Sequence, residues 1–267
     1  MIFSGIRPLR QRVAVMSALL MLPLALIVGV NVAITYSKVR ETLESVPMSA
    51  AVVSRQAIYA TLVGAARYGV AVGDGLAHGG APGNFLERSL AHNPGYAAIR
   101  VKLGDASRFA VRPQDRAQAE AIAAVLDAQA FGAPDLDSPN FPAKAWFRPL
   151  TIGDGRAFGV RVRYDVAAGP TEVVIVIGGD MMRRVLDAID DQSGAQITLL
   201  DDKARPLAAS ANEGWLPGPE LALADAASPT LSLGRDGVSR LYAVRRLAGP
   251  HAYVVAALDT ATTSSLR

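Results

Sequence analysis

The residues that could carry out chemistry are few and widely spaced in this chain of 267 residues. His78, His92 and His251 lie far apart near turn residues, which argues against a shared metal site or a catalytic triad. There is no cysteine, no Gly-x-Ser-x-Gly elbow, no Walker loop and no His-Glu-x-x-His motif. Gly178-Gly179-Asp180 resembles the start of a diguanylate cyclase signature, but Met181-Met182 replaces its Glu-Phe. We therefore expect no catalytic residue, no metal site and no cofactor in this chain, which leaves binding functions.

One apolar segment, Val13 to Tyr36, is long enough to cross a membrane. Its 24 residues include no Asp, Glu, Lys or Arg. As a helix it would be roughly 36 Å long, against about 30 Å for the hydrocarbon core of a bilayer. A cleaved secretory signal would have a shorter apolar region and an Ala-x-Ala-like end, and a buried core helix would show a polar face. We expect a transmembrane helix over 13–36, preceded by a cytoplasmic stub over 1–12.

Basic residues around this segment predict its orientation. Arg7, Arg10 and Arg12 precede it, whereas Lys38 and Arg40 follow it. The excess of bases favours a cytoplasmic N-terminus, so the rest of the chain should be periplasmic, held by a single span in the inner membrane. The net charge of +3 is spread over scattered residues with no basic run, which argues against nucleic acid as a partner.

A long exported helix is expected after the span. Residues 37–46 continue the apolar helix, and Pro47 should kink or break it, because its ring removes a backbone donor and disfavours helical geometry before it. Apolar residues recur at helical spacing from Met48 to about Ala77, and the Gly/Pro-rich run 79–83 ends the helix. We expect two copies of the chain to dimerise along 37–77.

Strand patterns dominate the remaining sequence. Residues 96–103 alternate apolar and polar side chains, as expected of a sheet with one face on a core. Turn residues separate further strands into two groups, so the expected fold class is α+β, with two antiparallel-sheet modules after the long helix. The expected strands are 96–103, 108–111, 144–152, 156–166 and 171–178, then 196–200, 205–210, 230–233, 239–247 and 252–258, with helices at 85–92, 113–131 and 180–191.

This order of elements resembles the double Cache sensor domains of bacterial transmembrane receptors. Residues 195–208, AQITLLDDKARPLA, are similar to the strand, Asp, turn and return strand that open the membrane-proximal module of that family. Tyr242 to Leu258 is similar to the closing hairpin of that module. The resemblance covers about residues 37–260 and implies a membrane-distal PAS-like module within 37–191 and a smaller membrane-proximal one within 192–260.

The same resemblance implies a ligand pocket in the distal module, between its sheet and the long helix. In members that bind amines and amino acids, a basic-x-Trp-aromatic run lines the pocket and an Asp after a later strand closes it. Lys144-Ala145-Trp146-Phe147 is similar to that run, and Asp180, after the apolar run 173–179, is similar to that Asp. A Lys would bind a ligand carboxylate, an Asp would bind an ammonium group, and aromatic faces would hold the cation and exclude water.

These residues also have purely structural interpretations. Trp146 and Phe147 are large apolar rings of the kind that pack in a core. Asp180 is a preferred N-cap residue and could cap a helix over Met181 to Ile189. Arg161 and Arg163 alternate with apolar residues, as on a solvated strand face.

A sensor outside the membrane must pass its signal to an output. The resemblance implies the input half of a receptor, expected to be a two-component sensor histidine kinase truncated before a second span to which the tail 261–267 would lead. The alternatives are the sensor part of a chemoreceptor or diguanylate cyclase, and a single-span anchored adapter that binds a protein partner. The expected partners are a small-molecule ligand, an amine or a carboxylate, the lipid bilayer and a second copy of the chain.

Overall fold

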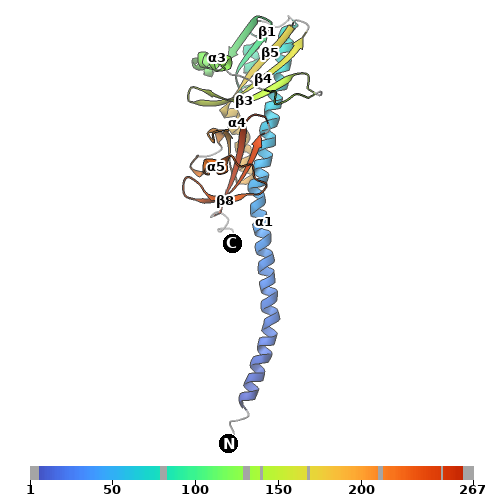
Figure 1. Ribbon diagram of the computed structural model, residues 1–267, viewed down its shortest axis with the longest axis vertical. Helices are drawn as coiled ribbons and strands as arrows, with labels where there is room; N and C mark the ends of the chain where they lie inside the picture. Colours follow the sequence, from blue (N-terminus) through green and yellow to red (C-terminus); the bar gives the residue numbers. More distant parts are fainter. Residues whose placement is uncertain are drawn as a thin grey trace. The chain divides into compact units, whose positions relative to one another are not determined.

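The chain folds into helices and two antiparallel sheets, which confirms the α+β fold class (Figure 1). The computed structural model describes residues 6–78, 83–128, 133–138, 141–166, 169–209, 213–247 and 249–260, and only the backbone of residues 6–33, 35–36 and 39–40. The chain separates into two compact units, residues 1–45 and 46–267. Both sheets belong to the second unit.

Helix α1 covers Ile6–Ala77. It continues through Pro47, so of the kink or short break predicted there, the break is wrong. The helix after Pro47 packs on both sheets, and this packing outweighs the loss of one backbone hydrogen bond. The span predicted over 13–36 falls within α1, but nearly all of its side chains lie outside the described residues. In the part of the chain that has described side chains, no helix is apolar over a length that could cross a bilayer.

The first sheet has the strand order β2-β1-β5-β4-β3. The predicted strands and the β3-β4-β5 meander are confirmed, while the pairing of β1 with β5 brings together segments about seventy residues apart in sequence. Helix α3 packs on the face of this sheet that is turned away from α1. The elements are α2 (Phe85–His92), β1 (Tyr96–Leu103), β2 (Ala106–Val111), a 3-10 helix (Pro113–Gln118), α3 (Ala119–Ala128), β3 (Lys144–Ile152), β4 (Gly155–Val166) and β5 (Gly169–Gly178).

The second sheet repeats the same order, as β7-β6-β10-β9-β8. In both sheets the first two strands form a hairpin at one edge, and the last strand lies in the centre. Helix α4 connects the two sheets. The elements are α4 (Gly179–Ser193), β6 (Gln196–Asp201), β7 (Pro206–Ala209), a 3-10 helix (Glu213–Trp215), α5 (Pro219–Ala222), β8 (Thr230–Leu233), β9 (Ser239–Leu247) and β10 (Ala252–Asp259).

A glycine lets α1 approach the first sheet closely. A Cβ atom at Gly73 would lie 2.2 Å from the Tyr164 hydroxyl oxygen and 3.0 Å from a methyl group of Val173. The Tyr164 hydroxyl donates a hydrogen bond of 2.8 Å to the backbone carbonyl of Val70 in α1. Burial and the neighbouring carboxylate of Asp74 raise the pKa of Tyr164, so the phenol stays protonated and remains a donor. This contact ties the end of β4 to α1.

We predict that Gly73→Ala destabilises the fold, whereas Gly64→Ala stabilises it. The added methyl group at Gly73 would overpack the contact with Tyr164 and cost about 1–3 kcal/mol. Gly64 lies on the exposed side of the same helix with open space around its Cβ position, so alanine there should add about 0.5–1 kcal/mol through helix propensity. Chemical denaturation of both variants checks this, and equal effects would contradict the close approach at Gly73.

Candidate ligand-binding site

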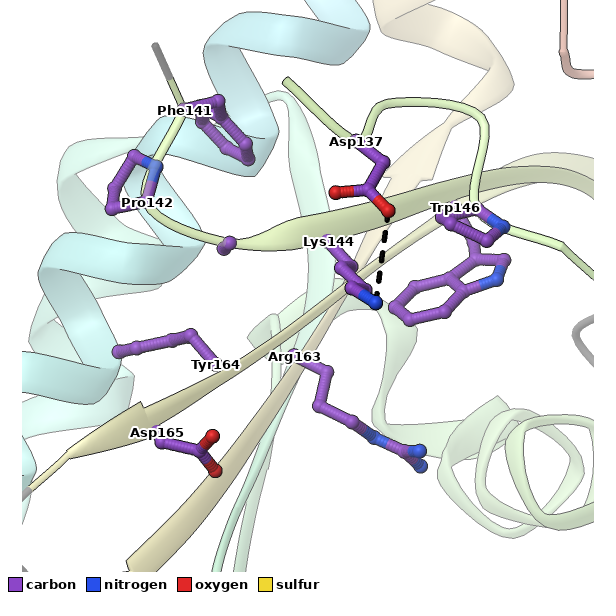
Figure 2. A pocket seen from close by; sticks show the side chains of 10 residues that line it. Asp137, Phe141, Pro142, Lys144, Trp146, Arg163, Tyr164 and Asp165 are labelled. Carbon is purple, nitrogen blue, oxygen red and sulfur yellow. Dashed lines mark ion pairs between the residues drawn. The ribbon is translucent and has the colours of Figure 1, made fainter. Parts of the chain in front are cut away.

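A pocket of about 580 Å³ opens at the edge of the first sheet, where β3 begins and β4 ends (Figure 2). The segment before β3 covers it, and two charged side chains of each sign surround it together with a tryptophan. The described lining residues are Pro134, Asp137, Phe141, Pro142, Ala143, Lys144, Trp146, Arg163, Tyr164 and Asp165. The size suits a small molecule.

The strand register assembles the polar part of this pocket. Lys144 lies opposite Arg163 in the antiparallel pair of β3 and β4, and Trp146 lies opposite Arg161. Directly opposite residues project from the same face of a sheet, so these three cations and the indole ring lie close together on one face. The guanidinium carbon of Arg163 is 6.0 Å from the centre of the Trp146 ring, within cation-π range.

Lys144 and Asp137 form an ion pair at the pocket, with 3.6 Å between the ammonium nitrogen and a carboxylate oxygen (Figure 2). Both side chains are more than half exposed, at 59% and 58%. An exposed pair of this kind contributes at most about 1 kcal/mol. A ligand carboxylate can therefore replace Asp137 as the partner of Lys144 at little cost.

A buried carboxylate holds the arginines of β4 in place. Glu172 of β5 forms ion pairs with Arg161 and with Arg163, the second with 2.9 Å between nitrogen and oxygen. Burial raises the pKa of Glu172, but the hydrogen bonds and charges of the two arginines outweigh it, and the pKa lies below its ordinary value. Glu172 is therefore ionised at neutral pH, and it orients Arg163 beside the pocket.

Phe147 lies in the core and does not line the pocket. Its side chain is fully buried and contacts Tyr59 of α1 edge-on, with ring centres 6.1 Å apart. Residues alternate between faces along β3, so Phe147 and Trp146 must point in opposite directions. The space between the sheet and α1, where the resemblance implied a pocket, is instead filled by Phe147, Val160, Val162, Val173, Ile175 and Ile177 together with side chains of α1.

Asp180 is also absent from the described lining of this pocket. It lies in the first turn of α4, where its half-exposed carboxylate is 3.4 Å from a guanidinium nitrogen of Arg112 and 3.6 Å from one of Arg184. Helix α4 begins at Gly179 with Gly178 as its N-cap, earlier than the sequence suggested, so Asp180 is inside the helix and does not cap it. Its charge is favourable near the positive end of the helix.

The structure thus brings Lys144 and Trp146 of the predicted site residues together, and adds Asp137, Arg163 and Asp165. The alternation of Arg161 and Arg163 with apolar residues was visible in the sequence, but it suggested a solvated face. The residue that distinguishes this face from an ordinary solvated one is Glu172, an acid on the neighbouring strand that pairs with both arginines. Its meaning depends on the register between β4 and β5, which aligns it with Arg163.

No protein-family model matches the chain, and no curated protein sequence matches it. Solved structures do match its fold. The ligand-binding domain of the Campylobacter jejuni chemoreceptor Tlp3, in complex with L-valine, has a TM-score of 0.52 and 11% identity, covering 85% of this chain and 97% of that one. The ligand-binding domain of the Pseudomonas aeruginosa amino acid chemoreceptor PctB, in complex with L-arginine, has a TM-score of 0.52 and 12% identity, covering 84% and 97%.

A third similar structure is the extracellular domain of soHK1S-Z6, described as a histidine kinase. Its TM-score is 0.51 at 14% identity, and the match covers 87% of this chain and all of that domain. At such identities the likeness concerns the fold. The chain has the double Cache-like fold of the extracellular ligand-binding domains of chemoreceptors and of a histidine kinase.

Proposed function

We propose that the chain is the extracytoplasmic ligand-sensing module of a membrane signal-transduction receptor, with the first sheet as its membrane-distal module and the second as its membrane-proximal module. The observation that carries this proposal is the pocket of the distal module, where Lys144 and Arg163 lie beside the Trp146 ring and two carboxylates. Concave sites with aromatic walls and a few charged groups are the usual form of small-molecule sites. Similar structures with bound amino acids support it.

The lining charges suit a small ligand that carries a carboxylate, an ammonium group or both. Lys144 and Arg163 would bind the carboxylate, and Asp137 and Asp165 would accept hydrogen bonds from an ammonium group. The ring of Trp146 would pack against the apolar part of the ligand or against its cation. Asp180, in contact with Arg112 and Arg184, has no place in this ligand set.

The proposal includes a membrane anchor and an output. The segment 13–36 would span the inner membrane and place the two sheets in the periplasm, and protease accessibility in spheroplasts would test that placement. The proposed output is a two-component histidine kinase, for which phosphoryl transfer from ATP in receptor-containing membranes is the test. A chemoreceptor is the second candidate because similar structures come from chemoreceptors, and a change in swimming bias on ligand addition would favour it.

Ligand binding is predicted to depend on Lys144. In a thermal-unfolding screen of the full chain against amino acids, amines and carboxylates, a ligand at a hundredfold excess over its Kd adds about 2.7 kcal/mol to the folded state. Lys144→Met removes one exposed cation, so it should weaken a carboxylate ligand by about tenfold and leave the unliganded midpoint unchanged.

The matched control is Lys203→Met, because Lys203 is a likewise exposed lysine in the turn between β6 and β7 and is not among the described residues that line the pocket. Equal loss of binding in both variants would contradict the role of Lys144. A screen in which no compound raises the midpoint would favour the anchored adapter that binds a protein partner.

Glu172 is predicted to stabilise the fold in a pH-dependent way. Its pKa is lower in the folded than in the unfolded chain, so its contribution is fully present above the unfolded value and is lost as pH falls through the folded one. Glu172→Gln should cost roughly 2 kcal/mol at pH 7, and the difference from the natural chain should shrink toward pH 3. Urea unfolding across pH measures it, with Glu87→Gln, at an exposed position of α2, as the control. A pH-independent difference would contradict the ion-pair account.

The dimer predicted along 37–77 would use the exposed side of α1, here called the stripe, which consists mostly of small residues. In the natural chain, which has no cysteine, Gly64→Cys and Ala71→Cys on the stripe should cross-link between copies in membranes, and Ala57→Cys beside it should not. A response without helical periodicity would contradict the dimer. The stripe consists of Ser49, Val53, Gln56, Ala60, Gly64, Arg67, Ala71 and Gly75.

A further inference from the structure

The segment of residues 133–138, here called the pocket loop, contacts two different regions. Pro134 and Asp137 line the distal pocket. Between them, Asp135 points away from solvent, and its side chain is only 6% exposed. The loop runs along the free edge of β3, where Leu136 and Ala145 exchange two backbone hydrogen bonds of 3.1 and 2.9 Å. Any displacement of Asp137 by a ligand therefore acts on a short segment that also positions Asp135.

Asp135 is held by two groups of β3. Its carboxylate accepts a hydrogen bond of 2.6 Å from the backbone N–H of Phe147 and one of 2.5 Å from the Arg148 guanidinium. The arginine side chain is 14% exposed, so this is a largely desolvated pair. Such a pair is sensitive to geometry, because separating the partners leaves a buried charge without compensation.

The same two residues contact the second sheet. Gly249 lies in the turn between β9 and β10, and its carbonyl oxygen is 3.4 Å from the Arg148 guanidinium. Gly249 has φ of +92°, and a Cβ atom there would lie 2.6 Å from Cβ of Asp135. A side chain at position 249 would clash with Asp135, so the turn and the pocket loop lie close together at the junction of the sheets.

The turn that is contacted leads into the last strand. β10 is the central strand of the second sheet and pairs with both β6 and β9. A hollow of about 330 Å³, lined among others by Arg148 and His251, adjoins the contact and leaves space for the arginine to move. A shift of the pocket loop would therefore act on the turn that leads into the start of β10.

We propose that Asp135, Arg148 and Gly249 form a coupling contact that transmits the state of the distal pocket to the β9–β10 hairpin. That this contact carries a signal rests on the proposed function. The contact itself requires that a change on either side alters the other side, since coupling between sites is reciprocal.

The test perturbs the second sheet and measures the first, without any ligand. In Gly249→Ala of the full chain, the new methyl group meets Asp135, and backbone amide exchange of Phe147 should accelerate by about tenfold because its acceptor is displaced. Gly237→Ala is the matched control: Gly237 also has positive φ, +79°, in a turn of the same sheet, but nothing lies within 4 Å of its Cβ position. Exchange of Phe147 should be unchanged there.

Equal acceleration in both variants, or none in Gly249→Ala, would overturn the proposal. A second measurement does not depend on the folding of Gly249→Ala. In Asp137→Cys, a trimethylammonium thiol reagent attached to the cysteine replaces the negative charge by a positive one. Backbone amide exchange at His251 and Ala252 should then change by about threefold. The same label at Asp154→Cys, in the exposed turn between β3 and β4, should not. Equal changes, or none, would again overturn it. Failure of the ligand screen alone leaves this result interpretable, since neither measurement uses a ligand.

Discussion

Both sheets pack one face against the same helix, and the arrangement of the second compact unit depends on that shared contact. One cluster of buried residues contains side chains of α1, of the first sheet and of the second, so the two modules have a common core. Small residues of α1 keep the contact close, as at Gly73, which lies against Tyr164. Because interiors are densely packed, a change of position in either sheet cannot be absorbed locally and has to be shared with the helix.

Strand register positions the charged side chains of the pocket, as α1 positions the two sheets around the core. The cations of β3 and β4 lie side by side because antiparallel pairing aligns them. Glu172 of the next strand forms ion pairs with both arginines of β4, Arg161 and Arg163, whose like charges would otherwise repel each other. The cost of burying this carboxylate is met by its ion pairs, as its lowered pKa shows. The pocket therefore has charged side chains on its strand side. Its covering segment is held to an edge strand by backbone hydrogen bonds and by the Asp135 carboxylate.

Much of the fold could be predicted from sequence, because turn residues and alternation mark strand ends directly. The hairpins and α2 follow from such local signals. Pairing of β1 with β5 does not, since it joins distant segments and depends on which face each strand buries. The candidate site could be predicted in part, because Lys144 and Trp146 do line the pocket. Phe147 faces α1 instead, since neighbouring residues on a strand point to opposite faces. Asp180 pairs with arginines, and Arg112 comes near it only in the folded chain. Asp137 and Asp165 gave no signal, as isolated acids in polar segments are common.

The identical strand order of the two sheets has a mechanical consequence. In each module the central strand is the last strand in sequence: β5 continues into α4, and β10 continues into the residues after Asp259. A force along the axis of such a strand loads the ladders on both of its sides in shear, so many hydrogen bonds that lie perpendicular to the strand resist it together. An edge strand in the same place would peel away one bond at a time. The strand by which each module continues into the next segment is thus held by hydrogen bonds on both of its sides, and it resists a pull along its axis better than an edge strand would.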